Sequence, residues 1–61
     1  MKFHDLTFHN KRGIVYKFWY VPERNEYDVL QLIKGRNEKV AVVHERGIEI
    51  LISIGVIVKV D

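Results

Sequence analysis

The chain contains 61 residues, of which 48% are hydrophobic, and it carries a net charge of +2 at pH 7. A chain of this length predicts a single small domain that spans residues 1–61. Because it contains no cysteine, disulfide bonds and thiolate zinc sites are excluded. No apolar run typical of a signal peptide follows Lys2, and no stretch reaches the roughly 18 apolar residues of a membrane span. We therefore expect a soluble, intracellular and cytoplasmic protein.

Clusters of turn-forming residues divide the chain into short apolar runs. Gly, Pro and Asn supply the backbone angles of turns, and the clusters lie at 10–13, 22–26, 34–38 and 44–47. The runs between them cover 3–9, 14–21, 27–33, 39–44 and 48–60. This spacing predicts an all-β fold, with about five antiparallel strands in a small curled sheet or SH3-like barrel. A short helix over 25–34, with Asn25 as its N-cap, is an alternative for the third run.

Alternation along the runs predicts which faces are buried. In the second run the even positions, from Ile14 to Tyr20, are all apolar or aromatic and form the face expected to point inward. The odd positions place Lys17 and Trp19 on the opposite face. In the first run, the face that carries His4, Leu6 and Phe8 is expected to point inward.

The last run, 48–60, shows the strongest pattern. Every even position is Ile or Val, which predicts one long strand with a buried face, bent at Gly55. A helix over 45–54 is the alternative, because Glu45 and Glu49 lie four residues apart and Gly55 stands where a helix C-cap would. In that case the fold is α+β with one helix.

An antiparallel meander would also separate the charges. Successive turns then lie at alternate ends of the sheet, so the first and third clusters share one end. That end is expected to hold mainly basic side chains, namely Lys11, Arg12, Lys34, Arg36 and Lys39. The other end is expected to be mainly acidic, with Glu23, Glu26, Asp28 and Glu45. We therefore expect a polarised molecule despite its small net charge.

The polar residues form no recognisable catalytic or metal-binding motif. His4 and His9 point to opposite faces of a strand, and a zinc site would lack thiolate ligands. His44 and Glu45 begin like the zinc-protease motif, but Ile48 stands where its second histidine belongs. The glycines are isolated, so a phosphate-binding loop is not indicated. We predict no enzyme activity, no catalytic residue, no cofactor, no metal site and no small-molecule substrate.

The aromatic residues around Trp19 are the feature that most favours a binding role. If the even face is the core, the outward face carries Val15, Lys17, Trp19 and Val21. Leu51 and Ile57 are expected to extend this apolar patch, and such patches usually mark interfaces. The prediction is a non-enzymatic protein-interaction module, such as a small regulator or inhibitor of a larger protein. Its partner is expected to be another protein or a second copy of itself.

Nucleic-acid binding is the alternative function. An exposed Trp beside cations stacks unpaired bases while the cations hold phosphate, an arrangement that small β-barrels use. The residues assigned to this role are Lys11, Arg12, Lys17, Trp19, Lys34, Arg36 and Lys39. The position of the basic turns relative to Trp19 distinguishes the two functions. No membrane partner is expected.

Overall fold

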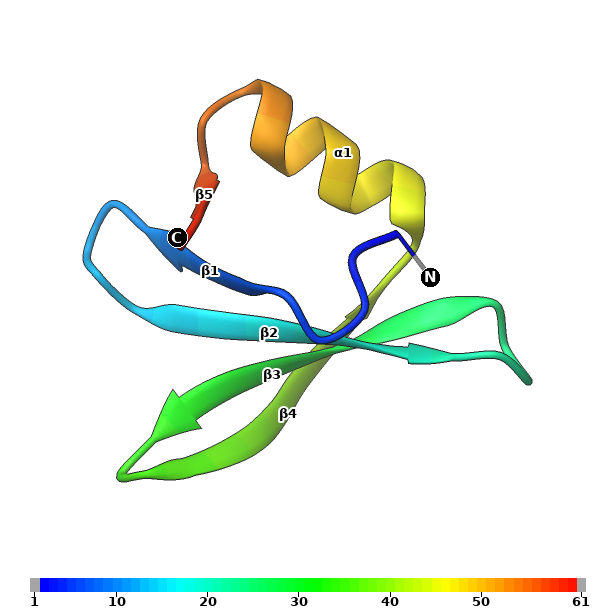
Figure 1. The fold of residues 1–61 in the computed structure, drawn as a ribbon, viewed down its shortest axis with the longest axis horizontal. Coiled ribbons are helices and arrows are strands. Elements are labelled where there is room, and N and C mark those ends of the chain that lie inside the picture. The colour runs from blue at the N-terminus through cyan, green and yellow to red at the C-terminus, as the bar shows by residue number, and fades with distance from the viewer. Residues whose placement is uncertain (1, 61) are drawn as a thin grey trace.

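The computed structural model describes residues 2–60, which form five strands and one helix (Figure 1). The strands are β1 (Thr7–Asn10), β2 (Val15–Val21), β3 (Glu26–Ile33), β4 (Arg36–Val43) and β5 (Ile57–Lys59). The helix α1 covers Glu45–Ser53 and lies between β4 and β5 along the chain. The region 25–34 is therefore mainly strand, and the alternative prediction of a helix there is wrong.

A single antiparallel sheet arranges the strands in the order β4-β3-β2-β1-β5. Strands β1 to β4 pair in sequence as hairpins, and β5 returns to pair with the free side of β1. The sheet curls, and α1 crosses its open side from the β4 edge to the β5 edge (Figure 1). The predicted small curled antiparallel sheet is thus confirmed, with β4 and β5 as its two edges.

The core lies between the curled sheet and α1. Its enclosed side chains are Phe3, Phe8, Phe18, Tyr27, Ile48 and Ile57. Phe8 and Phe18 come from the faces that alternation predicts, and their rings meet edge to face with 5.3 Å between centroids. Leu6 and Tyr20 pack against this cluster from the same faces. His4 packs on Trp19 instead, so its predicted inward position is wrong. Ile48 is the side chain by which α1 enters the core.

The region after β4 is helical, so the helix alternative for 45–54 is confirmed and the long bent strand over 48–60 is wrong. The chain must pass from one edge of the sheet to the other, and the nine residues of α1 span about 13 Å of that path. Ile48 and Leu51, three residues apart, face the core, whereas Ile50 is half exposed. Tertiary context therefore overrides the strand preference of isoleucine.

The C-terminus of α1 ends in a Schellman motif. Gly55 adopts a φ of 77°, and its N–H donates to the carbonyl of Ile52 at 3.1 Å. The N–H of Val56 donates to the carbonyl of Leu51 at 3.0 Å. This bond places the apolar side chains of Val56 and Leu51 next to each other. Within residues 2–60 no helix has the length and apolar character needed to cross a membrane.

Candidate functional site

A hollow of about 400 Å³ opens into the core where β4 and β5, the two edges of the sheet, remain unpaired with each other. One wall is β4 from Val40 to Val43, the other comprises Leu51, Val56 and Ile57, and the floor comprises Tyr16, Phe18 and Val29. The lining is almost entirely apolar, and Asn10 supplies a polar group. We call this hollow the seam groove.

The β4 wall of the seam groove is an exposed sheet edge. Its outer side pairs with no described strand, so half of its backbone N–H and C=O groups lack a ladder partner. The first half of β4, 36–39, is polar and charged, which discourages strand addition. The second half is apolar, and its Val40 and Val42 side chains are 47% and 44% exposed. Val40 is an extra residue in the register, so β4 bulges where its apolar half begins.

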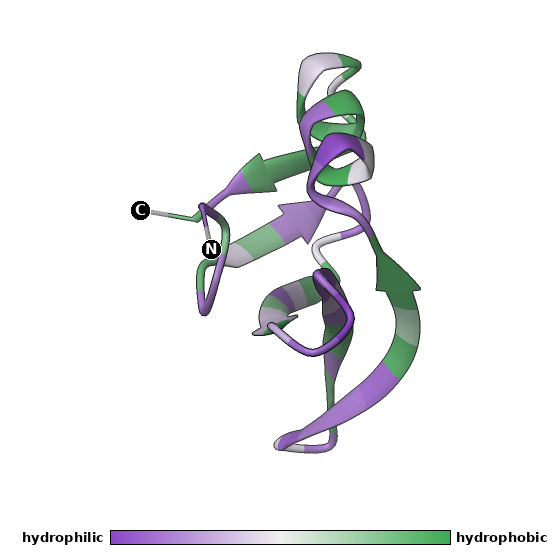
Figure 2. Cartoon of the chain, turned by 90° about the vertical axis from the view of Figure 1, so that its right-hand side faces the viewer, coloured by the Kyte–Doolittle hydropathy of each residue, from purple (hydrophilic) through white to green (hydrophobic). Residues whose placement is uncertain are grey.

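The flank of α1 beside β4 is also apolar. A Cβ atom on Gly47 would come within 2.7 Å of Val43 Cγ2, so the helix lies tightly against the end of β4. With about 100° between successive helical residues, Ile50 and Ile54 fall on the same flank as Gly47 and Leu51. Ile50 is 50% exposed and Ile54 is 65% exposed. Figure 2 shows the apolar half of β4 rising directly to α1. The exposed Ile50 and Ile54 therefore lie on the helix flank that adjoins the apolar half of β4.

The seam groove continues to the β1–β2 turn, which is basic. A second hollow shares Asn10 and Val56 with the groove and is also lined by Lys11 and Arg12. The Asn10 Oδ1 atom accepts the N–H of Arg12 at 2.9 Å and that of Ile14 at 3.0 Å, which fixes the turn. Neither cation pairs with a carboxylate among residues 2–60.

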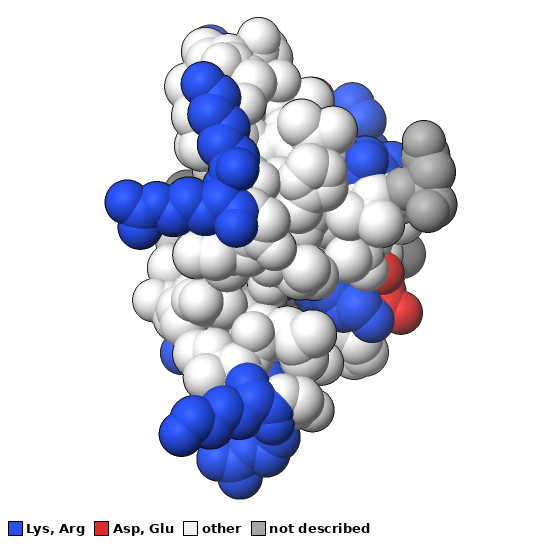
Figure 3. All heavy atoms as spheres, turned by 90° about the vertical axis from the view of Figure 1, so that its left-hand side faces the viewer, with Lys and Arg blue, Asp and Glu red and all other residues white. Residues whose placement is uncertain are grey.

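The two basic turns share one end of the molecule, as the meander predicts. The β1–β2 turn and the β3–β4 turn both lie on the left in Figure 1. Figure 3 views that side and shows groups of basic side chains with hardly any acidic ones. Lys34 in the β3–β4 turn forms no ion pair among the described residues, while Arg36 lies 3.4 Å from Glu38. The basic end is therefore a real feature of the fold.

The four predicted partner-binding residues lie on the face of β2 that points away from the core. They are Val15, Lys17, Trp19 and Val21, which alternate with the buried Phe18 and its neighbours. Trp19 is 47% exposed, and its ring packs on His4 with 4.4 Å between centroids. Lys17 forms an ion pair with Asp5 at 3.6 Å. These residues form a small mixed surface rather than a wide apolar one.

The predicted extension of that surface by Leu51 and Ile57 is wrong. Ile57 is buried in the core, and Leu51 packs against the core and lines the seam groove. An outward position for both residues requires one strand over 48–60. The helix turns Leu51 inward, and β5 pairs with β1 so that Ile57 faces the concave side.

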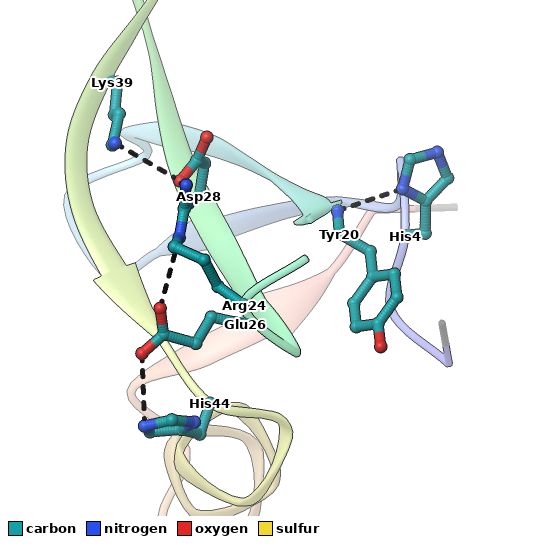
Figure 4. A network of polar contacts seen from close by, with 7 residues as sticks. All are labelled: His4, Tyr20, Arg24, Glu26, Asp28, Lys39 and His44. Carbon is teal, nitrogen blue, oxygen red and sulfur yellow. Dashed lines mark hydrogen bonds and ion pairs between the residues drawn. The ribbon is translucent and has the colours of Figure 1, made fainter. Parts of the chain in front are cut away.

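Ion pairs cover the sheet face next to Trp19 (Figure 4). Arg24 approaches Asp28 at 2.6 Å and Glu26 at 3.3 Å, and Lys39 approaches the same Asp28 carboxylate at 3.4 Å. Asp28 is the cross-strand neighbour of Trp19. The charges beside Trp19 therefore compensate one another, and the nearest one across the sheet is acidic.

The residues predicted for nucleic-acid binding do not form one surface. Those at the basic end are Lys11, Arg12, Lys34 and Arg36. Lys17 and Lys39 are held by Asp5 and Asp28. Trp19 lies in the second half of β2, toward the opposite end of the molecule. The basic turns are therefore separate from Trp19.

The histidines have separate structural partners. His4 Nδ1 accepts the backbone N–H of Tyr20 at 3.0 Å, and His44 lies 3.3 Å from Glu26 (Figure 4). His9 Nδ1 lies 3.0 Å from the backbone carbonyl oxygen that follows it. Among residues 2–60, no three histidine or carboxylate side chains gather closely enough to hold a metal ion.

Tyr27 connects the N-terminal segment, β3 and α1. Its buried hydroxyl accepts the N–H of Phe3 and donates to Glu45 Oε1, both at 3.4 Å. Burial raises the pKa of Tyr27, the Phe3 N–H acts in the opposite direction, and the negative charge of Glu45 raises the pKa further. The interactions of this hydroxyl are those of a structural group.

The apolar residues of the seam groove are the functional candidates that the sequence reasoning missed. Their signal was the uninterrupted run of Val40 to Val43, which is apolar on both faces of a strand. Such a strand is normally covered on both faces, yet Val40 and Val42 remain exposed in β4. No protein-family model, no curated protein and no solved structure matches this chain. Function is therefore inferred from the geometry alone.

Proposed function

We propose that this chain is a non-enzymatic protein-interaction module that binds an extended segment of a partner polypeptide. The segment adds to the free side of β4 and inserts alternate side chains into the seam groove. Backbone hydrogen bonds along the edge contribute affinity, and the shape of the groove contributes specificity. A module of this size is suited to be a regulator or inhibitor of a larger protein.

The apolar groove at the open seam is the observation that supports this proposal. Val40 to Val43, Leu51 and Val56 line the groove, and Ile50 and Ile54 on the neighbouring flank of α1 are 50% and 65% exposed. The groove volume of about 400 Å³ lies in the range of ligand-binding hollows. Exposed large apolar side chains lower the solubility of a small protein. Their clustering is therefore most simply explained by a partner that covers them.

The proposal includes no reaction, because the reactive groups have structural partners. The Ser53 hydroxyl donates to the carbonyl of Ile50 at 2.9 Å. The Tyr27 hydroxyl donates to Glu45, and the histidines are engaged separately. The polar side chains that line the seam groove are Asn10, whose amide oxygen holds the β1–β2 turn, and Tyr16, whose hydroxyl accepts from Asn10 Nδ2. No acid–base or nucleophile–base pair faces it.

Selection of random linear peptides on the immobilised full chain tests the proposal. We expect enriched peptides to bind the wild-type protein and to lose at least about tenfold in affinity for Ala41→Phe, because the added ring fills the groove. Leu32→Phe is the matched control, since Leu32 is 49% exposed on β3 and lies outside the groove. Hydrogen exchange of β4 amides is expected to slow when the peptide binds.

Two outcomes would overturn the seam groove as the site. One is the absence of any enriched peptide. The other is binding that Ala41→Phe leaves unchanged and Trp19→Ala abolishes, which would assign the interaction to the outward face of β2 with Val15, Lys17 and Val21. In that second case the chain would still be a protein-interaction module, with the site that its sequence predicts.

Nucleic-acid binding is a second candidate, favoured by the basic end of the molecule. Titration with a single-stranded oligonucleotide at about 50 mM and about 200 mM salt tests it, because phosphate-driven binding weakens steeply over this range. Support would be saturable binding that weakens with salt and is lost in Lys11→Glu and Lys34→Glu. The absence of binding at micromolar oligonucleotide would remove this candidate.

A further inference from the structure

The seam groove has two chemically different ends. Its apolar part is bounded by β4 and α1, and it continues past Val56 to Lys11 and Arg12 in the β1–β2 turn. Asn10 and Val56 line both hollows, so the two hollows are adjacent and one extended chain is long enough to lie across both. The groove therefore passes from an apolar wall to a pair of cations.

The turn that carries the cations is held in place by Asn10. Its Oδ1 accepts the N–H of Arg12, and its backbone carbonyl accepts the N–H of Gly13 at 3.0 Å. Its Nδ2 donates to the Tyr16 hydroxyl at 3.4 Å, which connects the turn to the floor of the groove. Because the backbone of this turn is already ordered, little backbone entropy is lost when its cations meet an anion.

The carboxylates of residues 2–60 do not pair with Lys11 or Arg12. Lys17, Lys39 and Arg36 each lie within 3.6 Å of a carboxylate oxygen. Lys11 and Arg12 have no such partner among residues 2–60. A carboxylate that reaches them from outside meets uncompensated positive charge, next to an apolar wall where the attraction is less screened.

A second copy of the chain matches this surface poorly. In a two-fold antiparallel pairing of β4 with itself, a centre at Val40 places Glu38 opposite Val42 and Lys39 opposite Ala41. Charged side chains then face apolar ones. A centre in the apolar half restricts the ladder to 40–43, because α1 begins immediately afterwards at Glu45. The surface is better matched by a strand that is apolar in one part and acidic in the other.

We propose that the partner segment carries acidic residues beside its apolar ones, and that Lys11 and Arg12 bind those carboxylates at the end of the seam groove. This inference rests on the proposed function, because it names the chemistry of the segment that the groove receives. The apolar part supplies burial against Val40, Leu51 and Val56, and the acidic part fixes the direction in which the segment lies.

A charge exchange between protein and peptide tests the inference. We expect the peptides selected on the wild-type chain to be enriched in Asp and Glu on one side of an apolar stretch. Their affinity, measured by fluorescence anisotropy, is expected to fall about tenfold in the double variant Lys11→Glu/Arg12→Glu. Replacing the acidic residues of the peptide by lysine is expected to restore binding to that variant within about threefold.

Lys34→Glu is the matched control, because it makes the same charge change in the other basic turn, and we expect less than about a twofold effect. Peptides that require the groove but show no acidic enrichment and tolerate the double variant would overturn this inference and leave the proposed function standing. An equal loss in Lys34→Glu would indicate general attraction and would also overturn it.

A dimer in sedimentation that Ala41→Phe abolishes would identify a second copy as the occupant instead. Absence of groove binding would remove both proposals.

Discussion

Tyr27 joins the N-terminal segment to α1 through one hydroxyl, which accepts the Phe3 N–H and donates to Glu45. Burial raises its pKa, so the folded chain holds the phenol proton more tightly than the unfolded chain does. The contribution of this group to stability is fully present below about pH 10, the unfolded value. It is lost as the pH rises through the higher folded value.

Tyr27→Phe should therefore flatten the alkaline part of the stability curve. At neutral pH we expect it to cost about 0.5–1.5 kcal/mol, because two long hydrogen bonds are lost. Above about pH 10 we expect its free energy of unfolding to decline less than that of the wild type. Urea unfolding at successive pH values measures both. The control is Tyr16→Phe at a half-buried phenol, and equal alkaline slopes in wild type and Tyr27→Phe would contradict the assignment.

Lys34 adopts a left-handed backbone conformation that suits it poorly. It has a φ of 50° and precedes Gly35 at 77°, so the two form the type I′ turn between β3 and β4. Asn is much preferred over Lys at the first of these positions. We expect Lys34→Asn to stabilise the fold by about 1 kcal/mol, which raises the melting temperature by roughly 4–8 °C.

Thermal unfolding measures the effect of Lys34→Asn against Lys11→Asn, which removes the same charge at a position without a positive φ. A stabilisation confined to Lys34→Asn would assign it to backbone strain. Equal stabilisation by both variants would assign it to relief of repulsion between the basic turns, and would contradict the strain argument.

At the scale of elements, the turns between β1 and β4 were predicted correctly, whereas the fourth turn cluster, 44–47, is the beginning of α1. Glycine and asparagine in the turn clusters specified local backbone geometry, and the hairpins from β1 to β4 follow from them. The segment 45–54 was ambiguous because Ile48, Ile50 and Ile52 fit a strand by alternation, while Ile48 and Leu51 fit a helix by their spacing. The Gly55 C-cap was the local signal for the helix. The need to cross from the β4 edge to the β5 edge decided between them, and no local pattern contains that requirement.

The seam groove was less predictable, because it exists only where β4 and β5 do not pair with each other. Each of its walls reads as ordinary core sequence: Val40 to Val43 as a strand, and Leu51 and Val56 as parts of another. Only the strand order shows that β4 and β5 are edges with a hollow between them. The charges at its end were predicted correctly in position, because they depend only on the alternation of turns.

The contact between Gly47 and Val43 sets how closely α1 lies against β4. A Cβ atom at position 47 would come within 2.7 Å of Val43 Cγ2, and the valine side chain has little freedom to rotate. Alanine improves helix propensity by up to about 1 kcal/mol, whereas overpacking costs about 1–3 kcal/mol. We therefore expect Gly47→Ala to destabilise the fold by about 1 kcal/mol or more.

A double-mutant cycle checks this contact. In the background Val43→Ala, the substitution Gly47→Ala is expected to be neutral or stabilising, because the clashing methyl group is gone. Chemical denaturation of the four proteins in the cycle measures the coupling. Additive effects of the two substitutions would show that the close contact between Gly47 and Val43 does not determine how α1 packs on β4.

At the scale of the whole molecule, burial is limited and charge is segregated. The enclosed core has few residues, with Ile48 at 0% and Tyr27 at 1% exposure, while many large apolar side chains remain accessible. The basic turns lie together at one end, and the compensated ion pairs around Asp28 lie along the sheet face near the other. A segment that lies along the seam groove would cover part of the accessible apolar surface and would raise stability by mass action.

Ile50 and Ile54 belong either to the core or to an interface. Their contribution to the free energy of unfolding decides which. The double variant Ile50→Ser/Ile54→Ser changes side chains that are 50% and 65% exposed, at nearly unchanged helix propensity. We expect its free energy of unfolding to stay within about 1 kcal/mol of the wild type, whereas Ile48→Ala should cost about 2–5 kcal/mol because Ile48 is fully buried. Binding of selected peptides should weaken in the double variant, and fluorescence of a dye that binds exposed apolar surface should fall. A loss above about 2 kcal/mol that varies with protein concentration would instead show that these side chains are buried between copies of the chain.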